Sequence, residues 1–183
     1  KNDFNIDVEN EKVILFFGYI RKYKGLNYLI EAMPDILKKI KVRLLIVGEF
    51  YEDESVTKDR IRDLKLEKNI SVVSDYVPNE KVKYFFCASD CVVLPYIDAT
   101  QSGITQIAYY YDKPVIATDV GGLSEVVLNN KTGFIIEPKN SKAIADSVVK
   151  FYEDDLEEKF SRNAGEEKKN YSWETFTDAI KNL

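Results

Sequence analysis

Histidine is absent from all 183 residues of this chain. Histidine is the most frequent general base in enzymes and the usual partner of a serine or cysteine nucleophile, so its absence excludes the common triad chemistries. Any reaction catalysed by this chain must therefore depend on lysine and arginine cations, on backbone dipoles or on carboxylates.

Cysteine is nearly absent as well. Cys87 and Cys91 stand four residues apart, with no second pair and no histidine near them. This spacing makes a poor zinc site, so we expect two reduced thiols in a cytosolic protein. The sequence also lacks an evident cluster of carboxylates that could hold a metal ion. We therefore expect no metal site and no cofactor.

Long apolar runs and a basic excess are also missing. No stretch approaches the ~18 apolar residues that a membrane-spanning helix needs, and the first residues lack the pattern of a signal peptide. The net charge of −5 argues against a nucleic-acid-binding domain. What remains, 45% hydrophobic and 31% charged residues, is typical of a globular domain with a substantial core.

The chain alternates between short apolar runs and longer amphipathic ones. The apolar runs predict strands at 12–18, 42–48, 70–74, 91–95, 114–118 and 132–138. The amphipathic runs predict helices at 25–40, 54–65, 79–88, 103–111, 122–128, 142–151, 156–169 and 173–182. Strands that are apolar throughout suit a parallel sheet with helices on both faces. The fold class is therefore α/β, a Rossmann-like doubly wound parallel sheet of about six strands.

In such a sheet, ligands bind beyond the carboxyl ends of the strands, where the strand order reverses. After the first predicted strand comes GYIRKYKG (18–25), which places Arg21 and Lys24 between two glycines at the start of a helix. Free N–H groups at a helix start and nearby cations suit a phosphate group. An ordinary basic surface loop is the competing interpretation. The segment is neither a P-loop nor a dinucleotide fingerprint.

After the fourth predicted strand comes PYIDATQSGIT (95–105). Ser102 and Gly103 put small residues at a helix start, where backbone can approach a ligand closely. Thr100, Gln101 and Ser102 could bind hydroxyl or phosphate groups. A plain helix cap would need only one of these residues.

Two further segments also lie beyond strands. Gly121-Gly122, after the fifth strand, has a structural and a functional interpretation of equal weight. Tyr76-Val77-Pro78, after the third strand, could lie against a flat ring.

These segments, taken in order, resemble the carboxyl-terminal half of a family 4 (group 1) retaining glycosyltransferase of GT-B architecture. The resemblance rests on FFGYIRKYKGLNYLIEA, RLLIVGEF, ISVVSDYVPNEKVKYFFCASDCVVLPY, KPVIATDVGGLSEVV and TGFIIEP, and it covers nearly the whole chain. It implies a single nucleotide-sugar-binding domain over 1–183. Within that domain, 1–11 would be a linker and 171–183 a helix that crosses to a missing amino-terminal domain.

The resemblance also implies residue roles. Lys24 before Gly25 would hold the donor diphosphate, with Arg21 replacing a family arginine that stands at Tyr19 here. The residues implied to contact the donor are Gly18, Gly25, Gly48, Tyr76, Val77, Pro78, Thr100, Gln101, Ser102, Gly103 and Ile104.

One departure from the family leaves the donor open. Most members carry two glutamates separated by seven residues. Thr100 and Ala108 stand there in this chain, or Ala99 and Ile107 with a shift of one residue.

The implied reaction transfers a sugar, with retention, from a nucleotide-diphosphate-sugar to a glycan or lipid-linked acceptor, in cell-surface polysaccharide synthesis. The missing domain would bind that acceptor. The whole enzyme would be cytoplasmic and could associate peripherally with the inner face of the membrane, and this half alone would be inactive. A non-catalytic nucleotide-sugar-binding module and a GT-B nucleotide-sugar epimerase remain alternatives. The missing histidine counts against the epimerase.

Overall fold

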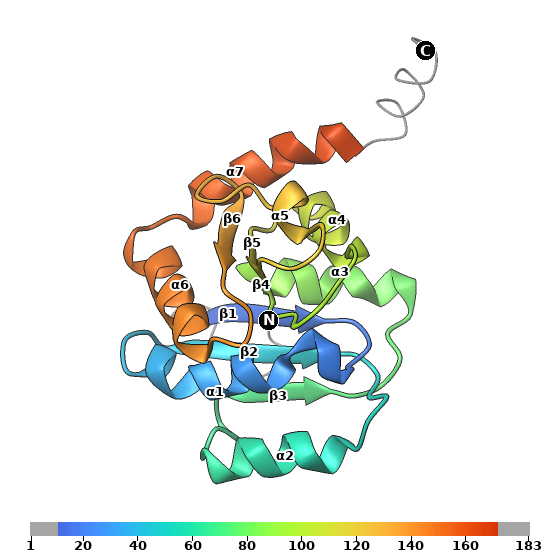
Figure 1. Ribbon diagram of the computed structural model, residues 1–183, viewed down its shortest axis with the longest axis vertical. Helices are drawn as coiled ribbons and strands as arrows, with labels where there is room; N and C mark the ends of the chain where they lie inside the picture. The colour runs from blue at the N-terminus through green and yellow to red at the C-terminus, as the bar shows by residue number, and fades with distance from the viewer. Residues whose placement is uncertain (1–10, 172–183) are drawn as a thin grey trace.

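A computed structural model describes residues 11–171 of the chain. Six parallel strands form one sheet in the order β3-β2-β1-β4-β5-β6 (Figure 1). Their bounds are Lys12–Phe17 (β1), Val42–Val47 (β2), Ile70–Val73 (β3), Cys91–Leu94 (β4), Val115–Thr118 (β5) and Gly133–Ile136 (β6). The predicted fold class and all six predicted strands are confirmed.

Helices cover both faces of the sheet (Figure 1). Their bounds are Leu26–Leu37 (α1), Glu54–Asp63 (α2), Asn79–Ala88 (α3), Gly103–Tyr110 (α4), Leu123–Val126 (α5), Ser141–Glu153 (α6) and Glu157–Glu167 (α7), with 3₁₀ turns at Lys22–Lys24 (η2) and Lys168–Tyr171 (η3). Helix α1 continues through Pro34. None of these helices combines the length and the apolar character needed to cross a membrane.

Strand β1 shows why the sheet is apolar throughout. Ile14 and Phe16 face the core under α1, α2 and α6, whereas Val13 and Leu15 face the core under α3, α4 and α5. All four side chains are completely buried. A strand that buries both of its faces cannot show the polar alternation of a solvent-facing sheet.

The ends of the predicted domain fall partly outside the described residues. Residues 1–10 of the predicted linker and residues 172–183 of the predicted crossover helix lie there. Glu11, which was assigned to the linker, is buried and pairs with Arg43 at 3.1 Å between Oε2 and Nε. Glu11 is therefore part of the packed domain.

The strand order reverses between β1 and β4. The chain runs outward from β1 to β2 and β3, crosses back to β4 beside β1, and continues outward to β5 and β6. The loops that follow β1 and β4 therefore diverge to opposite faces of the sheet and leave a crevice at the carboxyl edge.

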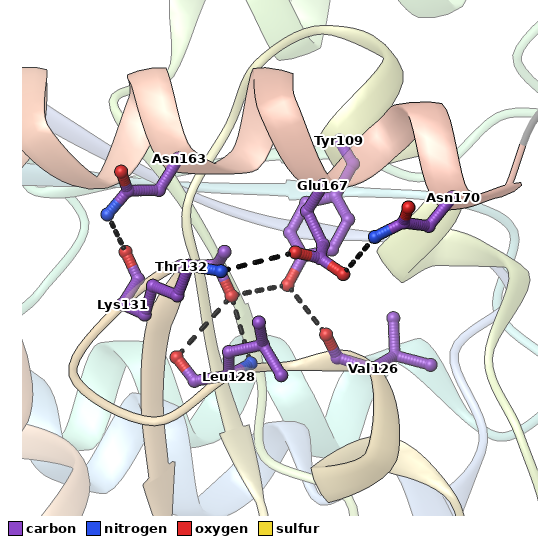
Figure 2. Close-up of polar contacts among 8 residues, drawn as sticks. All are labelled: Tyr109, Val126, Leu128, Lys131, Thr132, Asn163, Glu167 and Asn170. Carbon is purple, nitrogen blue, oxygen red and sulfur yellow. Dashed lines mark hydrogen bonds and ion pairs between the residues drawn. The ribbon is translucent and has the colours of Figure 1, made fainter.

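A buried polar cluster fixes α4 to the loop before β6 and lies beside α7 (Figure 2). The Tyr109 hydroxyl donates to the Val126 carbonyl at 3.1 Å and exchanges a hydrogen bond of 2.6 Å with Thr132 Oγ1. The Thr132 hydroxyl also accepts from the Leu128 N–H at 2.9 Å. Burial raises the pKa of Tyr109 to about 12, so this phenol stays protonated and can donate. The cluster sets the position of α4 relative to the β5–β6 loop.

Replacing Tyr109 with phenylalanine should lower the free energy of unfolding by about 1–2 kcal/mol, because the Val126 carbonyl would lose its donor inside the protein. Urea denaturation of the chain measures this change. The matched control is Tyr110→Phe on the same helix, where the side chain is 69% exposed and no loss is expected. Equal stability of the two variants would contradict a structural role for the Tyr109 hydroxyl.

Candidate functional site

The loop after β1 is built on two glycines that touch. Gly18 has a φ of 103° and Gly48, at the end of β2, a φ of 145°. A Cβ placed on Gly48 would lie 2.2 Å from the Gly18 carbonyl oxygen, so only glycine fits there. The ends of β1 and β2 therefore come together with no side chain between them, and they form the floor of the crevice on this side.

Lys24 points back over this floor. Its Nζ lies 3.0 Å from the position that a Cβ on Gly18 would take, and 5.5 Å from the centre of the Tyr96 ring. The residue is only 8% exposed. Within residues 11–171, no carboxylate oxygen lies within 4.0 Å of this ammonium group.

The environment of Lys24 lowers its pKa from 10.5 to about 8, first because burial disfavours the charged form and second because Arg21 repels it. A buried cation without a carboxylate partner is costly. An anionic ligand would supply the missing counter-charge and would raise the pKa of the ammonium group again.

The β1 and β4 loops are joined next to Lys24. The Ile97 N–H donates to the Tyr23 carbonyl at 2.7 Å. Gly25 has a left-handed φ of 65°, and a Cβ there would lie 2.0 Å from the Pro95 carbonyl oxygen. These contacts hold the lysine loop directly against the segment that leads to α4.

The amino terminus of α4 faces the crevice. Ser102 caps the helix by accepting from the Ile104 N–H at 3.3 Å, and its hydroxyl lies 3.3 Å from the Tyr96 hydroxyl. A Cβ placed on Gly103 would meet no atom within 4 Å. Protein packing therefore does not require a glycine at this position, and its backbone is open to a ligand. The Gly103 N–H and the helix dipole attract negative charge there.

Gly121 and Gly122 support the loop before α4. A Cβ on Gly121 would lie 1.9 Å from the Ala99 carbonyl oxygen, and the Gly122 N–H donates to the Thr100 carbonyl at 2.7 Å. The double glycine thus has a structural role, since it lets the loop at 99–101 sit close to the end of β5.

Two adjoining cavities occupy the crevice. One has a volume of about 530 Å³ and is lined by Tyr23, Lys24, Tyr96, Asp98, Ala99, Thr100, Gln101, Ser102, Gly103 and Ile104. The other has a volume of about 340 Å³ and is lined by Phe17, Gly18, Tyr19, Lys24, Gly48, Glu49, Tyr76, Val77, Asn79, Val82, Ile104 and Ile107. Lys24 and Ile104 line both, so they stand at the junction.

The structure brings together ten of the thirteen residues assigned from the sequence. Three do not line either cavity. Gly25 is buried beneath the joined loops, and Pro78 lies one residue beyond Val77 at the start of α3. Arg21 lines a different cavity, and its guanidinium lies 4.4 Å from the centre of the Tyr51 ring.

Several lining residues were missed in the sequence. Tyr96 and Asp98 lie just beyond β4, and Glu49 follows Gly48 just beyond β2. Their position directly after strands was the signal that could have found them. Burial raises the pKa of Tyr96 to about 12, so its hydroxyl stays protonated.

The structure also distinguishes the two alternative positions of the glutamate pair that this chain lacks, Thr100 with Ala108 or Ala99 with Ile107. Ala108 is completely buried in the core under α4, whereas Ile107 lines the smaller cavity. Ala99 and Thr100 both line the larger one. The pair Ala99 and Ile107 therefore faces the cavities, and neither side chain carries a charge.

Carboxylates do not gather into a metal site here. Within residues 11–171, no group of three or more histidine, cysteine, aspartate or glutamate side chains could hold a metal ion. The Lys24 ammonium group and the Gly103 N–H lie at the larger cavity, and donors of this kind suit an anion.

The fold and the site together define a Rossmann-like domain with a crevice at its topological switch point. Residues 1–171 match the family model of the glycosyl transferases group 1. The chain belongs to this family, and it corresponds to the carboxyl-terminal half of a GT-B glycosyltransferase. It covers 45%, 42% and 44% of the lengths of the first three curated relatives that it matches.

Three similar proteins show the range of the match. A capsular polysaccharide biosynthesis glycosyltransferase of Staphylococcus aureus is 31% identical over 144 residues, which cover 78% of this chain and 37% of that protein. The C-terminal domain of a group 1 glycosyl transferase from Francisella tularensis is 25% identical, with a TM-score of 0.80 over 88% of this chain and 87% of that one. The Anabaena protein HepE, solved in complex with UDP, has a TM-score of 0.81 at 21% identity, over 96% of this chain and 50% of that one.

Gly25 and Gly103 should respond oppositely to alanine. Gly25→Ala should lower the free energy of unfolding by roughly 2 kcal/mol or more, because the methyl group meets the Pro95 carbonyl and the backbone is left-handed. Gly103→Ala should leave stability unchanged or raise it by about 0.5 kcal/mol. Thermal and urea denaturation measure both. A stable Gly25→Ala variant would show that the two loops are not held together as described.

Lys24 should titrate near pH 8, as followed by the NMR shift of its ¹³Cε, and Arg21→Gln should raise that pKa by removing the nearby cation. The folded-state pKa lies below the unfolded value of 10.5. The stability of the chain relative to a Lys24→Met variant should therefore increase between about pH 8 and 10.5, where only the unfolded state keeps the proton. A titration near 10.5 would contradict the buried, unpaired ammonium group.

Proposed function

We propose that this domain binds the nucleotide-diphosphate-sugar donor of a retaining glycosyltransferase. The single observation that carries the proposal is the buried Lys24 ammonium group, which lacks a carboxylate partner in residues 11–171 and stands at the junction of the two cavities. A diphosphate placed there would meet Lys24 on one side and the start of α4 on the other.

The two cavities suit the two ends of such a donor. The smaller cavity, with Tyr76, Val77 and Ile107, offers apolar and aromatic surface for a base and ribose. The larger cavity, with Thr100, Gln101 and Ser102, offers hydroxyl and amide groups for a sugar. HepE was solved with UDP, which supports a uridine nucleotide as the first donor to test.

The chemistry assigned to this half is stabilisation of the leaving group. As the bond between the sugar and the phosphate breaks, negative charge grows on the departing diphosphate. The Lys24 ammonium group and the N–H groups near Ser102, Gly103 and Ile104 stabilise that charge more than they stabilise the ground state. No protein nucleophile is needed, because the departing phosphate can accept the proton of the acceptor hydroxyl.

Ile107 changes the expected ribose contact. With an apolar side chain on the cavity wall, recognition of the ribose depends on backbone groups and shape in place of a carboxylate. We therefore assign donor selectivity to the surface formed by Tyr76, Val77 and Ile107. Apolar contacts of this kind discriminate between ligands less sharply than a buried hydrogen bond does.

The whole enzyme would transfer the sugar to a glycan or lipid-linked acceptor held by the amino-terminal half. Its capsular relative supports a role in cell-surface polysaccharide synthesis. The loss of carboxylates at Ala99 and Ile107 also suits a second candidate, a domain that binds nucleotide sugars without catalysis. Turnover by the full-length protein distinguishes the two.

Calorimetric titration with UDP, GDP and ADP tests the donor site. At least one of these nucleotides should bind the chain, and Lys24→Met should weaken its affinity at least tenfold, since a charge-assisted hydrogen bond is lost. Lys22→Met, in the same 3₁₀ turn but outside both cavities, is the matched control and should change affinity less than twofold. Equal loss in both variants would assign the effect to general charge, and unchanged affinity in Lys24→Met would refute the site.

A further inference from the structure

The loop that carries Lys24 also borders a separate cavity of about 770 Å³. Segments after four strands line it: Arg21 and Lys22 after β1, Tyr51 and Glu52 after β2, Ile97 after β4 and Lys139 after β6. It therefore opens at the same carboxyl edge of the sheet as the donor cavities, yet Lys24 and the start of α4 do not line it.

The charge of this cavity is opposite to that of the chain. Three cations and one carboxylate line it, whereas the whole chain has a net charge of −5. The carboxylate, Glu52, already accepts from the Lys22 backbone N–H at 2.7 Å. Within residues 11–171, neither Arg21 nor Lys139 has a carboxylate oxygen within 4.0 Å.

Tyrosine rings form much of the remaining wall. The Arg21 guanidinium lies over the Tyr51 ring, 4.4 Å from the ring centre. The Tyr51 ring also packs edge-on against Tyr19, with 5.0 Å between the two ring centres. Tyr23 and Tyr28 also line the cavity. The guanidinium is thereby held over the Tyr51 ring, and the planar group can offer two parallel hydrogen bonds to an anion.

This combination favours a ligand with both an anionic group and a sugar ring. Arg21 and Lys139 suit a phosphate or carboxylate. Amphipathic tyrosine rings suit a sugar, since they present an apolar face to C–H groups and a hydroxyl to O–H groups. A purely apolar ligand would leave the two cations without partners, and free inorganic phosphate would leave the aromatic wall uncovered.

We propose that the cavity around Arg21, Tyr51 and Lys139 binds an anionic sugar, a hexose bearing a phosphate or carboxylate group. Tyr23 lines both this cavity and the larger donor cavity, and its carbonyl is bonded to Ile97 between them. The bound sugar would therefore lie beside the sugar end of the donor. Its source is either a residue of the acceptor or a free sugar phosphate that acts as an effector. Only the acceptor role rests on the proposed function.

Calorimetric titration of the 183-residue chain with glucose 6-phosphate and with glucuronate tests the site, with glucose and inorganic phosphate as comparison ligands. We expect saturable binding of at least one anionic sugar, at least fivefold tighter than either comparison ligand. Lys139→Met should weaken it at least fivefold and leave UDP affinity unchanged. The control Lys68→Met, an exposed lysine before β3, should change neither.

The same titrations can also contradict the proposal that this cavity binds an anionic sugar. Absence of saturable binding by both anionic sugars would overturn the proposal, as would unchanged affinity in Lys139→Met. Displacement of the sugar by saturating UDP would show that the cavity belongs to the donor site. A failure to bind UDP, GDP and ADP alike would refute the donor site and leave this inference standing, so the two failures are distinguishable.

The full-length enzyme separates the two sources of the ligand. If the anionic sugar is part of the acceptor, added glucose 6-phosphate or glucuronate should compete with the acceptor, and Lys139→Met should raise the KM for the acceptor. If it is a free effector, the same addition should change kcat and leave the acceptor KM unchanged. Either pattern supports the site, and the absence of both, with normal turnover in Lys139→Met, would contradict it.

Discussion

The contact between the loops after β1 and β4 determines the rest of this site. The hydrogen bond from the Ile97 N–H to the Tyr23 carbonyl, together with the close approach of Gly25 to the Pro95 carbonyl, joins two segments that lie about seventy residues apart in sequence. Strands β1 and β4 are neighbours in the sheet, so the two loops start side by side before they diverge. Because the loops are joined, Lys24 and the amino terminus of α4 face the same cavity.

The electrostatics of Lys24 follow from that geometry. Burial against Tyr96 and Gly18 removes water from the ammonium group, and Arg21 adds repulsion, so the pKa of Lys24 falls to about 8. The group still carries its charge at neutral pH, where an anion can stabilise it. In the proposed complex, relief of this unfavourable environment would add to the affinity for a diphosphate. The Gly103 N–H at the start of α4 would act on the same charge.

The β1 loop also separates two kinds of binding surface. Lys24 turns inward over the two glycines, whereas Arg21 turns outward onto Tyr51. The two cations therefore serve different cavities, although they are three residues apart. The cavity of Lys24 would take the diphosphate of the donor, and the cavity of Arg21 would take an anionic sugar next to it.

Much of this arrangement could be predicted from the sequence. Strands with two buried faces give uninterrupted apolar runs, so the strands and the parallel sheet were recognisable from residues such as those of β1 and β2. The rule that ligands bind after strand ends also located Lys24, Ser102 and Gly103. The orientation of Arg21 could not be predicted, because it depends on Tyr51, which lies in another loop.

Two other features also depended on tertiary contacts. The role of Gly121 and Gly122 became clear only from the Ala99 and Thr100 carbonyls that pack on them. The choice between Ala108 and Ile107 depended on the rotation of α4, which the buried cluster around Tyr109 fixes. A one-residue difference on a helix turns a side chain by about 100°, from the cavity into the core.

The most direct measurement of the central claim is a crystal structure of this chain with UDP. We predict that the diphosphate lies within hydrogen-bond distance of the Lys24 Nζ and of the Gly103 N–H, with the uracil against Tyr76 and Val77. A diphosphate bound between Arg21 and Lys139, with Lys24 uncontacted, would contradict this placement of the donor.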